Sequence, residues 1–240
     1  MDAGSDVQLG ELQAQDGGLV SGRVTLKGSD NSTRAAVRVP VYAIPDGAAG
    51  LAAGSPVTNL PPATTHYVTY TDGNGEYEIS AMAPGEYLVT AAVAGYMADV
   101  QFIDGLTIEQ RQRNKHLELI DDDVAAGVAA GVVLGQTNGG SSSLGGAGLR
   151  ARLDTGYAPD IPQATIDRIE DASGSVLRDA PWFRWQVLST LADAGGSYQL
   201  RLPPGTPRID GFVYGYQPAF REPVITADAT TQTDFTLEQN

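Results

Sequence analysis

The hydrophobic and polar residues of this chain alternate with a period of two in several short segments. In residues 76–81, every second residue from Tyr77 onward is apolar, and the residues between them are Glu or Ser. The same alternation occurs over residues 87–93 and 116–119. Because successive side chains of a strand point to opposite faces, this period predicts strands that bury one face, with Ala81 on the buried face of the first.

Turn-forming residues separate these segments. Asp72-Gly73-Asn74-Gly75 and Ala194-Gly195-Gly196 each precede a predicted strand, and glycine or asparagine there tolerates the positive φ of a tight turn. Pro84-Gly85 and Pro204-Gly205 mark the next reversals. The best helical pattern lies in residues 162–172, which we expect to form a short helix within a loop.

Two segments of the chain align with each other, residues 66–119 with residues 187–239. The matched positions are Asp72/Asp193, Gly75/Gly196, Tyr77/Tyr198, Pro84-Gly85/Pro204-Gly205, Gly95-Tyr96/Gly215-Tyr216 and Leu117-Glu118/Leu237-Glu238. Upstream, the sequence GLVSGRV at residues 18–24 is matched with GVVLGQT at residues 131–137. The chain therefore consists of two copies of one unit.

The repeat predicts the domain organisation. We expect a polar tail over residues 1–17, a first sandwich over 18–120, an acidic linker over 121–126 and a second sandwich over 127–240. Each copy has about seven short strands separated by turns, which is typical of an antiparallel β-sandwich.

Two long insertions interrupt the pattern of strands and turns. They are Asp46–Thr65 in the first copy and Asp154–Ala180 in the second. The insertions differ between the copies while the sandwich pattern does not. Since binding residues concentrate on loops held by a rigid scaffold, these insertions are candidates for contact with a partner or a neighbouring subunit, although surface insertions that the fold merely tolerates explain the same segments.

The order of the motifs resembles that of carboxypeptidase regulatory-like domains. The motifs in the first copy are Gly22-Arg23-Val24, Val37-Arg38-Val39, Thr71-Asp72, Gly75-Glu76-Tyr77, Pro84-Gly85-Glu86-Tyr87 and Gly95-Tyr96. The second copy departs from the pattern, because Leu191-Ala192-Asp193 replaces the Thr-Asp start and Pro207 stands where the P-G-x-Y tyrosine would be. The resemblance implies an all-β chain of two tandem seven-stranded Greek-key β-sandwiches of the transthyretin-like (prealbumin-like) or immunoglobulin-like type. It implies no particular function, because such modules occur in peptidases, surface proteins, receptors and assemblies.

The charge and the composition exclude several classes of partner and chemistry. With 15 Lys and Arg against 29 Asp and Glu, the net charge is −14, which disfavours nucleic acids and anionic membrane surfaces. No apolar run approaches about 18 residues, so no membrane insertion is expected, and a lipid tether stays open. The absence of cysteine excludes disulfides, thiolate catalysis and Cys-ligated zinc.

The sequence offers few residues for acid–base catalysis, because the chain has only two histidines, His66 and His116. His116 falls on the polar side of the last strand of the first copy, where the alignment places Thr236 in the second. His66 precedes a predicted strand and has no counterpart. A Ser-His-Asp triad or a His-ligated metal needs a histidine held beside its partners, so we expect no enzyme and no cofactor.

One candidate binding site consists of aromatic residues in the second copy. Trp182 and Arg184 are expected to face outward from one strand, and Tyr214 and Tyr216 add further rings. Such rings can stack on a sugar, which would make the chain a polysaccharide binder, although core and edge packing explain the same residues.

A second candidate site lies at the junction of the two copies. Asp121, Asp122 and Asp123 supply carboxylates that could bind Ca²⁺ and stiffen the junction. An acidic linker exposed to solvent explains the same residues without a ligand.

We expect a non-catalytic structural or interaction module that presents loops to a protein partner or self-assembles. An extracellular, cell-surface or periplasmic setting is favoured, because modules of this kind are common there. One alternative is a carbohydrate-binding module. The other is a structural component of a phage-tail-like or filamentous particle assembled in the cytoplasm, since residues 1–17 lack the features of a signal peptide.

Overall fold

The computed structural model describes residues 17–45, 67–97, 99–121, 125–137, 139–152 and 187–240. The strands before residue 122 are β1 (Gly18–Lys27), β2 (Thr33–Ala35), β3 (Pro40–Pro45), β4 (Tyr67–Tyr70), β5 (Glu76–Met82), β6 (Gly85–Ala91), β7 (Tyr96–Met97), β8 (Val100–Leu106), β9 (Arg111–Gln112) and β10 (Leu117–Asp121). Those that follow are β11 (Gly127–Thr137), β12 (Gly140–Ser143), β13 (Gly148–Arg152), β14 (Val187–Leu191), β15 (Ser197–Leu202), β16 (Arg208–Phe212), β17 (Ala219–Arg221), β18 (Thr230–Gln232) and β19 (Phe235–Glu238). These described residues contain no helix, and so none long and apolar enough to cross a membrane. The helix expected at residues 162–172 and both insertions lie outside the described residues.

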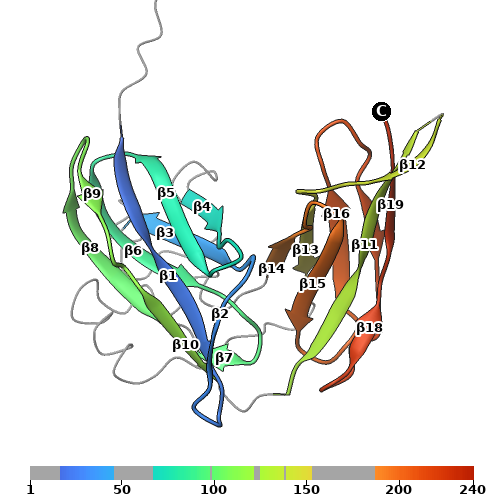
Figure 1. The fold of residues 1–240 in the computed structure, drawn as a ribbon, viewed down its shortest axis with the longest axis horizontal. Helices are drawn as coiled ribbons and strands as arrows, with labels where there is room; N and C mark the ends of the chain where they lie inside the picture. The colour runs from blue at the N-terminus through green and yellow to red at the C-terminus, as the bar shows by residue number, and fades with distance from the viewer. Residues whose placement is uncertain (1–16, 46–66, 98, 122–124, 138, 153–186) are drawn as a thin grey trace, which may run out of the picture.

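The strands before residue 122, called the first half from here on, form two facing sheets (Figure 1). One sheet has the order β2-β1-β10-β7, with β5 and β9 also paired to β1, and the other has the order β4-β3-β6-β8. Pairing is antiparallel except that β1 runs parallel to β9 and β10. The first and last strands of the unit therefore lie side by side and complete the larger sheet.

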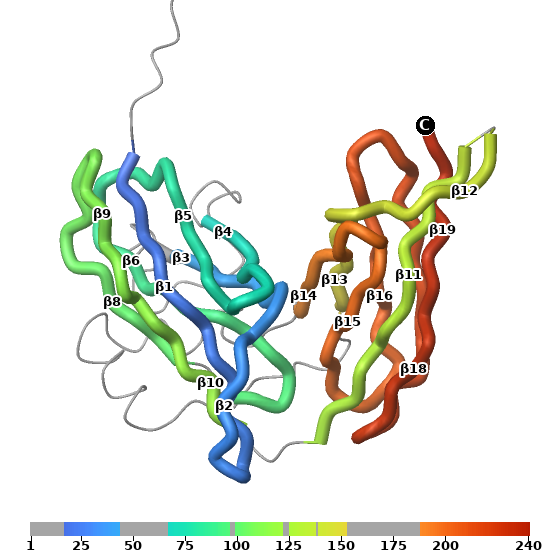
Figure 2. Tube along the Cα trace, in the orientation of Figure 1, coloured from blue at the N-terminus to red at the C-terminus, as the bar shows by residue number. Residues whose placement is uncertain are grey.

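The strands after residue 126, called the second half, repeat this arrangement, except that β7 has no counterpart among the described strands (Figure 2). β11 pairs with β12, β15, β18 and β19 as β1 pairs with β2, β5, β9 and β10, and the order β14-β13-β16-β17 repeats that of the smaller sheet. Each half holds seven strands of four or more residues among those described. The predicted all-β fold of tandem sandwiches is confirmed. The halves lie side by side, with β1 and β11 running in opposite directions in space (Figure 1).

The register of the first strands corrects the sequence alignment. Val24 and Val133 donate equivalent hydrogen bonds, both 2.8 Å long, to the carbonyls of the two matched turn glycines. Residues 18–24 therefore correspond to residues 127–133. The match with residues 131–137 is wrong by four residues, an even shift that leaves the same positions facing inward.

The register of the last strands corrects a second match. Val24 pairs with Leu117, and Val133 pairs with Phe235. Leu117 therefore corresponds to Phe235, and its match with Leu237 is wrong by two residues. This shift is also even, so the alternation of buried and exposed side chains could not reveal it.

A β-bulge near the end of β5 also departs from the sequence prediction. Gly18 pairs with Met82 and Val20 pairs with Ile79, so β5 has one extra residue. Ala81 takes a φ of 56° and is exposed, and Met82 is fully buried in its place. The prediction that Ala81 faces the core is wrong, because the bulge resets the alternation.

Each half has its own hydrophobic core between its two sheets. The first core includes Val20, Val24, Tyr77, Ile79, Met82, Tyr87, Leu117 and Leu119. The second includes Val133, Leu149, Leu188, Tyr198, Leu200, Ile209, Phe235 and Leu237. Two residues of the first half, Ala92 and Ala94, are fully or almost fully buried in the second core.

The predicted turns before β5 and β15 have the same construction. In the first, the Asp72 carboxylate accepts hydrogen bonds from the backbone amides of Asn74 and Glu76, at 2.8 and 2.9 Å. The carboxylate of Asp193 accepts the two equivalent bonds in the second turn. The glycine that ends each turn has a φ of 78°, so the predicted positive φ is confirmed.

We expect Gly75→Val to destabilise the first half by roughly 1–3 kcal/mol, because a β-branched residue is strained at positive φ. A Cβ at this position would also lie 2.5 Å from the carbonyl oxygen of Val24. Gly73→Val is the matched control, since no heavy atom lies within 4 Å of a Cβ built there. Thermal unfolding followed by circular dichroism measures both. If the two variants melt alike, the turn does not have this conformation.

Candidate functional site

The two halves meet where the edge strands of their smaller sheets come together. The Tyr70 hydroxyl, at the end of β4, hydrogen-bonds the Ser189 hydroxyl of β14 at 3.1 Å. Tyr42 of β3 packs against the second core and also hydrogen-bonds Ser189. Burial raises the pKa of Tyr42 to about 12, an effect that this hydrogen bond partly offsets. Burial thus disfavours the charged phenolate, and Tyr42 contributes a neutral hydroxyl to the junction.

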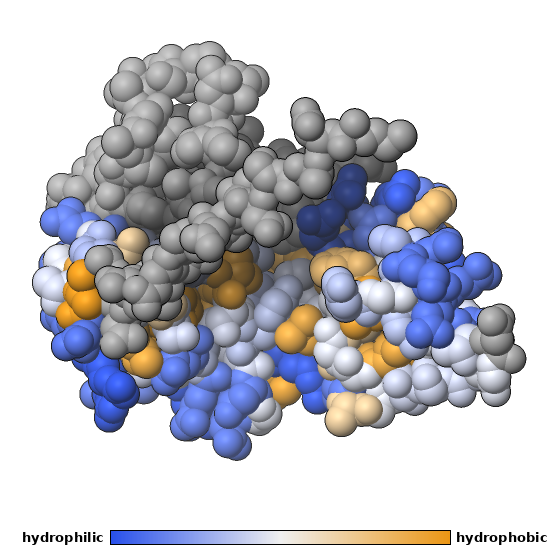
Figure 3. Space-filling view, turned by 90° about the horizontal axis from the view of Figure 1, so that it is seen from above, coloured by the Kyte–Doolittle hydropathy of each residue, from blue (hydrophilic) through white to orange (hydrophobic). Residues whose placement is uncertain are grey.

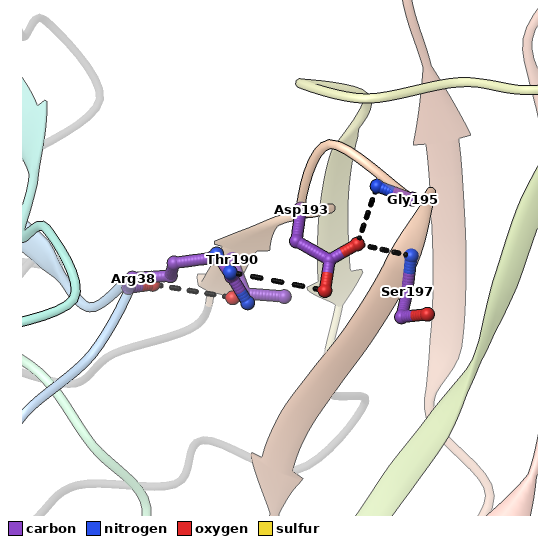
Figure 4. Close-up of polar contacts among 5 residues, drawn as sticks. All are labelled: Arg38, Thr190, Asp193, Gly195 and Ser197. Atoms are coloured by element: carbon purple, nitrogen blue, oxygen red, sulfur yellow. Dashed lines mark hydrogen bonds and ion pairs between the residues drawn. The ribbon is translucent and has the colours of Figure 1, made fainter.

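Arg38 reaches the second half with both its backbone and its side chain (Figure 4). Its carbonyl accepts a hydrogen bond of 3.1 Å from the Thr190 hydroxyl, and its guanidinium lies 3.9 Å from the Asp193 carboxylate. Arg38 has a φ of 55°, which is strained for a residue other than glycine. Hydrogen bonds to Thr71, from the amides of Arg38 and Val39, hold this conformation from within the first half.

Hydrogen bonds within the second half orient the Asp193 carboxylate toward Arg38. One of its oxygens accepts the amides of Gly195 and Ser197, both at 2.9 Å, and the other oxygen faces Arg38 (Figure 4). About a third of each side chain of this ion pair is exposed. Solvent therefore limits the ion pair to less than about 1 kcal/mol. It fixes the contact geometry more than it stabilises the fold.

Arg201 of β15, in the second half, contacts residues of the first half. Its Nε donates a hydrogen bond of 2.8 Å to the carbonyl of Ala94, and its guanidinium lies 5.5 Å from the centre of the Tyr96 ring. The Tyr96 hydroxyl also accepts a hydrogen bond of 3.3 Å from Arg34. Cation–π attraction and a hydrogen bond thus hold Arg201 against the first half.

A cleft of about 370 Å³ lies between these contacts. Arg34 and Arg38 line it from the first half, and Thr190 and Arg201 line it from the second. Val37, Val39, Leu188 and Leu200 are among its apolar residues. This cleft is the candidate functional site, because both halves build it and it offers polar donors beside apolar surface.

Two of the four residues predicted to bind sugar, Tyr214 and Tyr216, lie within the described residues. Tyr214 is fully exposed in the loop after β16. Tyr216 is half-buried, packs against the second core and bridges to Gln239. Trp182 and Arg184 lie outside the described residues, so a site that combines all four stays a prediction.

The predicted calcium site is described only in part. Asp121 belongs to β10 and pairs with Tyr96, whereas the sequence analysis places it in the linker. Asp122 and Asp123 lie outside the described residues. Among those described, no group of three or more His, Asp or Glu side chains could hold a metal ion.

His116 has a structural contact that the alignment obscured. Its Nδ1 accepts a hydrogen bond of 3.1 Å from the amide of Arg23. In the second half, Asp234 accepts the equivalent bond from Val132 at 2.9 Å. His116 therefore corresponds to Asp234 and not to Thr236. The Nδ1 atom of His116 serves as an acceptor for the backbone, and His66 lies outside the described residues.

Sequence reasoning missed the residues that join the two halves. Arg38 lies inside the Val37-Arg38-Val39 motif, which served only as a sign of the fold. Arg201 stands where the first half has its bulge, so a corrected alignment shows a difference between the copies there. Ser189 and Thr190 lie on β14, but no pattern in the sequence marks them as contacts.

Comparisons with known proteins give one partial family match. The family model described as polysaccharide lyase family 4, domain II, matches residues 43–116, which is less than half of the chain. No curated protein matches the chain. The resemblance to carboxypeptidase regulatory-like domains is not confirmed and stays a prediction.

Several solved structures are similar at low identity. A minor pilin of Streptococcus agalactiae is 12% identical, with 92% of this chain and 96% of that chain covered and a TM-score of 0.31. The shaft pilin SpaA of Lactobacillus rhamnosus GG is 13% identical, with 93% and 98% covered and a TM-score of 0.29. A streptococcal ancillary pilin is 15% identical, with 92% and 62% covered and a TM-score of 0.28. At these identities and TM-scores, the likenesses indicate no function for this chain.

We expect Tyr70→Phe to loosen the junction by about 1 kcal/mol, because it removes a hydrogen bond between the halves. Amide hydrogen exchange in β14 should therefore become faster. Tyr67→Phe is the matched control, because the Tyr67 hydroxyl accepts from the Ala83 amide within the first half. Equal exchange rates in β14 for the two variants would show that the Tyr70 contact does not hold the halves together.

Proposed function

We propose that the chain is a non-catalytic structural and interaction module that presents its two insertions to a protein partner or a neighbouring subunit. The two sandwiches act as a scaffold, and the contacts at Arg38, Tyr70 and Arg201 fix how they are placed. Residues 18–120 and 127–240 are proposed as the two domains, with residues 121–126 as their linker.

The observation that carries this proposal is the position of the insertions. Residues 46–66 connect β3 to β4, and residues 153–186 connect β13 to β14, so both occupy the same place in the repeat. At the base of each insertion, the strands are paired neighbours, with Ala43 opposite Tyr67 and Arg152 opposite Val187. Each insertion therefore returns to the point where it leaves the sheet, and its sequence can change without altering the sandwich.

The surface of the described residues supports contact through particular segments. On the face shown in Figure 3, the described hydrophobic residues lie in small separate patches among polar ones. A permanent interface is usually more apolar than this. On this face, the pattern favours a partner that is recognised by the insertions over one that covers a broad apolar area.

An exported or cell-surface setting is part of the proposal. The cysteine-free sequence suits an oxidising compartment, because it has no thiol to form an unwanted disulfide.

Site-specific photo-crosslinking in the cells that produce the protein tests this function. A photoreactive amino acid at Ser55 or Ala158 places the probe in an insertion, and one at Ser142, exposed in β12, is the matched control. We expect both insertion probes to give the same crosslinked partner or subunit and the control to give none. Crosslinks that form equally from Ser142, or none from either insertion, would contradict the proposal.

Carbohydrate binding is a second candidate, because three exposed rings come from β16, β17 and the loop that joins them. Phe212 of β16, Phe220 of β17 and Tyr214 between them are all exposed. Neighbouring rings on adjacent strands can stack on sugar faces. The guanidinium of Arg208 lies 4.0 Å from the centre of the Phe220 ring and places a cation beside them.

Tyr214→Ala tests this candidate without disturbing the core, since its side chain is fully exposed. If a sugar stacks on these rings, we expect Tyr214→Ala to weaken polysaccharide binding about tenfold, the loss of a single stacked ring. Binding is measured by titration calorimetry over a panel of neutral and acidic polysaccharides. Val68→Ala, at an exposed position of the first half, is the control. A panel in which no polysaccharide binds excludes this function.

A further inference from the structure

Cationic side chains are concentrated in the cleft between the halves. The chain has 15 Lys and Arg residues and a net charge of −14. Three of those cations, Arg34, Arg38 and Arg201, line this one cleft of about 370 Å³. No Asp or Glu is among the described residues that line it. The site therefore has the opposite charge to the chain as a whole.

The three guanidinium groups keep hydrogen-bond donors for a ligand. Arg34 donates one N–H to the Tyr96 hydroxyl, and Arg201 donates its Nε to the Ala94 carbonyl. An arginine has several more N–H groups than these contacts use. Arg38 lies 3.9 Å from Asp193, which is too long for a hydrogen bond. Planar guanidinium donors match the oxygens of carboxylate and phosphate groups.

The rest of the lining restricts the kind of anion. Ser189, Thr190 and Gln199 add polar groups, and Val37 and Leu200 are among the apolar residues. A volume of about 370 Å³ is at the lower end of the range for small-molecule sites. A small organic molecule with several acidic groups fits this combination of charge, size and apolar surface.

We infer that the cleft binds a small organic anion whose carboxylate or phosphate groups are held by Arg34, Arg38 and Arg201. Two of these arginines come from the first half and the third from the second, so the ligand bridges the halves. Its binding therefore stabilises the side-by-side arrangement, and the stabilisation rises with the logarithm of the ligand concentration above the Kd. This inference does not depend on the proposed function.

The conformation of Arg38 supports the assignment. Its φ of 55° is strained, and the bonds to Thr71 and Thr190 hold it in place. Strained residues are concentrated at functional sites, where they pre-organise a side chain. Here the strain places a guanidinium at the cleft before any ligand arrives.

Titration calorimetry of the full chain with citrate and with pyrophosphate tests the inference. Trimethyl citrate is the neutral control, since it keeps the carbon body and loses the charge. We expect millimolar or tighter binding of one or both anions, no binding of the ester, and weaker binding as sodium chloride is raised. The anion that binds more tightly identifies carboxylate or phosphate as the preferred group. Absence of binding by both anions overturns the inference.

Arg34→Gln tests the site itself. Arg34 is exposed, and its hydrogen bond to Tyr96 lies within the first half, so the variant should fold with its halves in contact. We expect citrate or pyrophosphate affinity to fall about tenfold, as for loss of one hydrogen bond to a charged group. Arg113→Gln removes an exposed cation that lies outside this cleft and is the matched control.

The location of binding gives an independent check. On adding the anion, amide chemical shifts should change on both sides of the cleft, at Ala35 in the first half and Gln199 in the second. Equal affinities for Arg34→Gln and Arg113→Gln, or shifts confined to other regions, would overturn the assignment.

Discussion

Ala92 and Ala94 belong to the first half by their place in the chain, but they are buried in the core of the second. Their small side chains let the two sandwiches approach closely enough for Arg201 to reach the Ala94 carbonyl. The polar contacts of Arg38 and Tyr70 follow from the same approach. The relative placement of the halves, the cleft between them and the proposed presentation of the insertions all depend on this packing.

Much of the fold could be predicted from the sequence, because its strongest signals are physical requirements. The Asp72 and Asp193 turns need a carboxylate that accepts backbone amides and a glycine at positive φ, and both requirements are visible as residues. The tandem β-sandwich fold follows from that repeat. The domain limits have no independent test and stay a prediction.

The alignments that failed concern strands in which the only sequence signal is the alternation of apolar and polar residues. The alignments of the first and last strands are wrong by four and two residues, and an even shift keeps every apolar residue on the same face. Only the hydrogen-bond register, with Val24 opposite Leu117 and Val133 opposite Phe235, separates these alternatives. The candidate site could not be predicted from the sequence for a related reason. Arg38, Thr190 and Arg201 meet across a junction whose geometry the strand pattern does not specify.

The central claim is that the two halves are held in one arrangement, and residual dipolar couplings measured by nuclear magnetic resonance test it most directly. Couplings from the strands of each half give the alignment of that half separately. A fixed junction predicts one alignment tensor, equal in size and direction for both halves when they are placed as in Figure 1. Two tensors of different magnitude would show that the halves move independently, and the account of the junction would then be wrong.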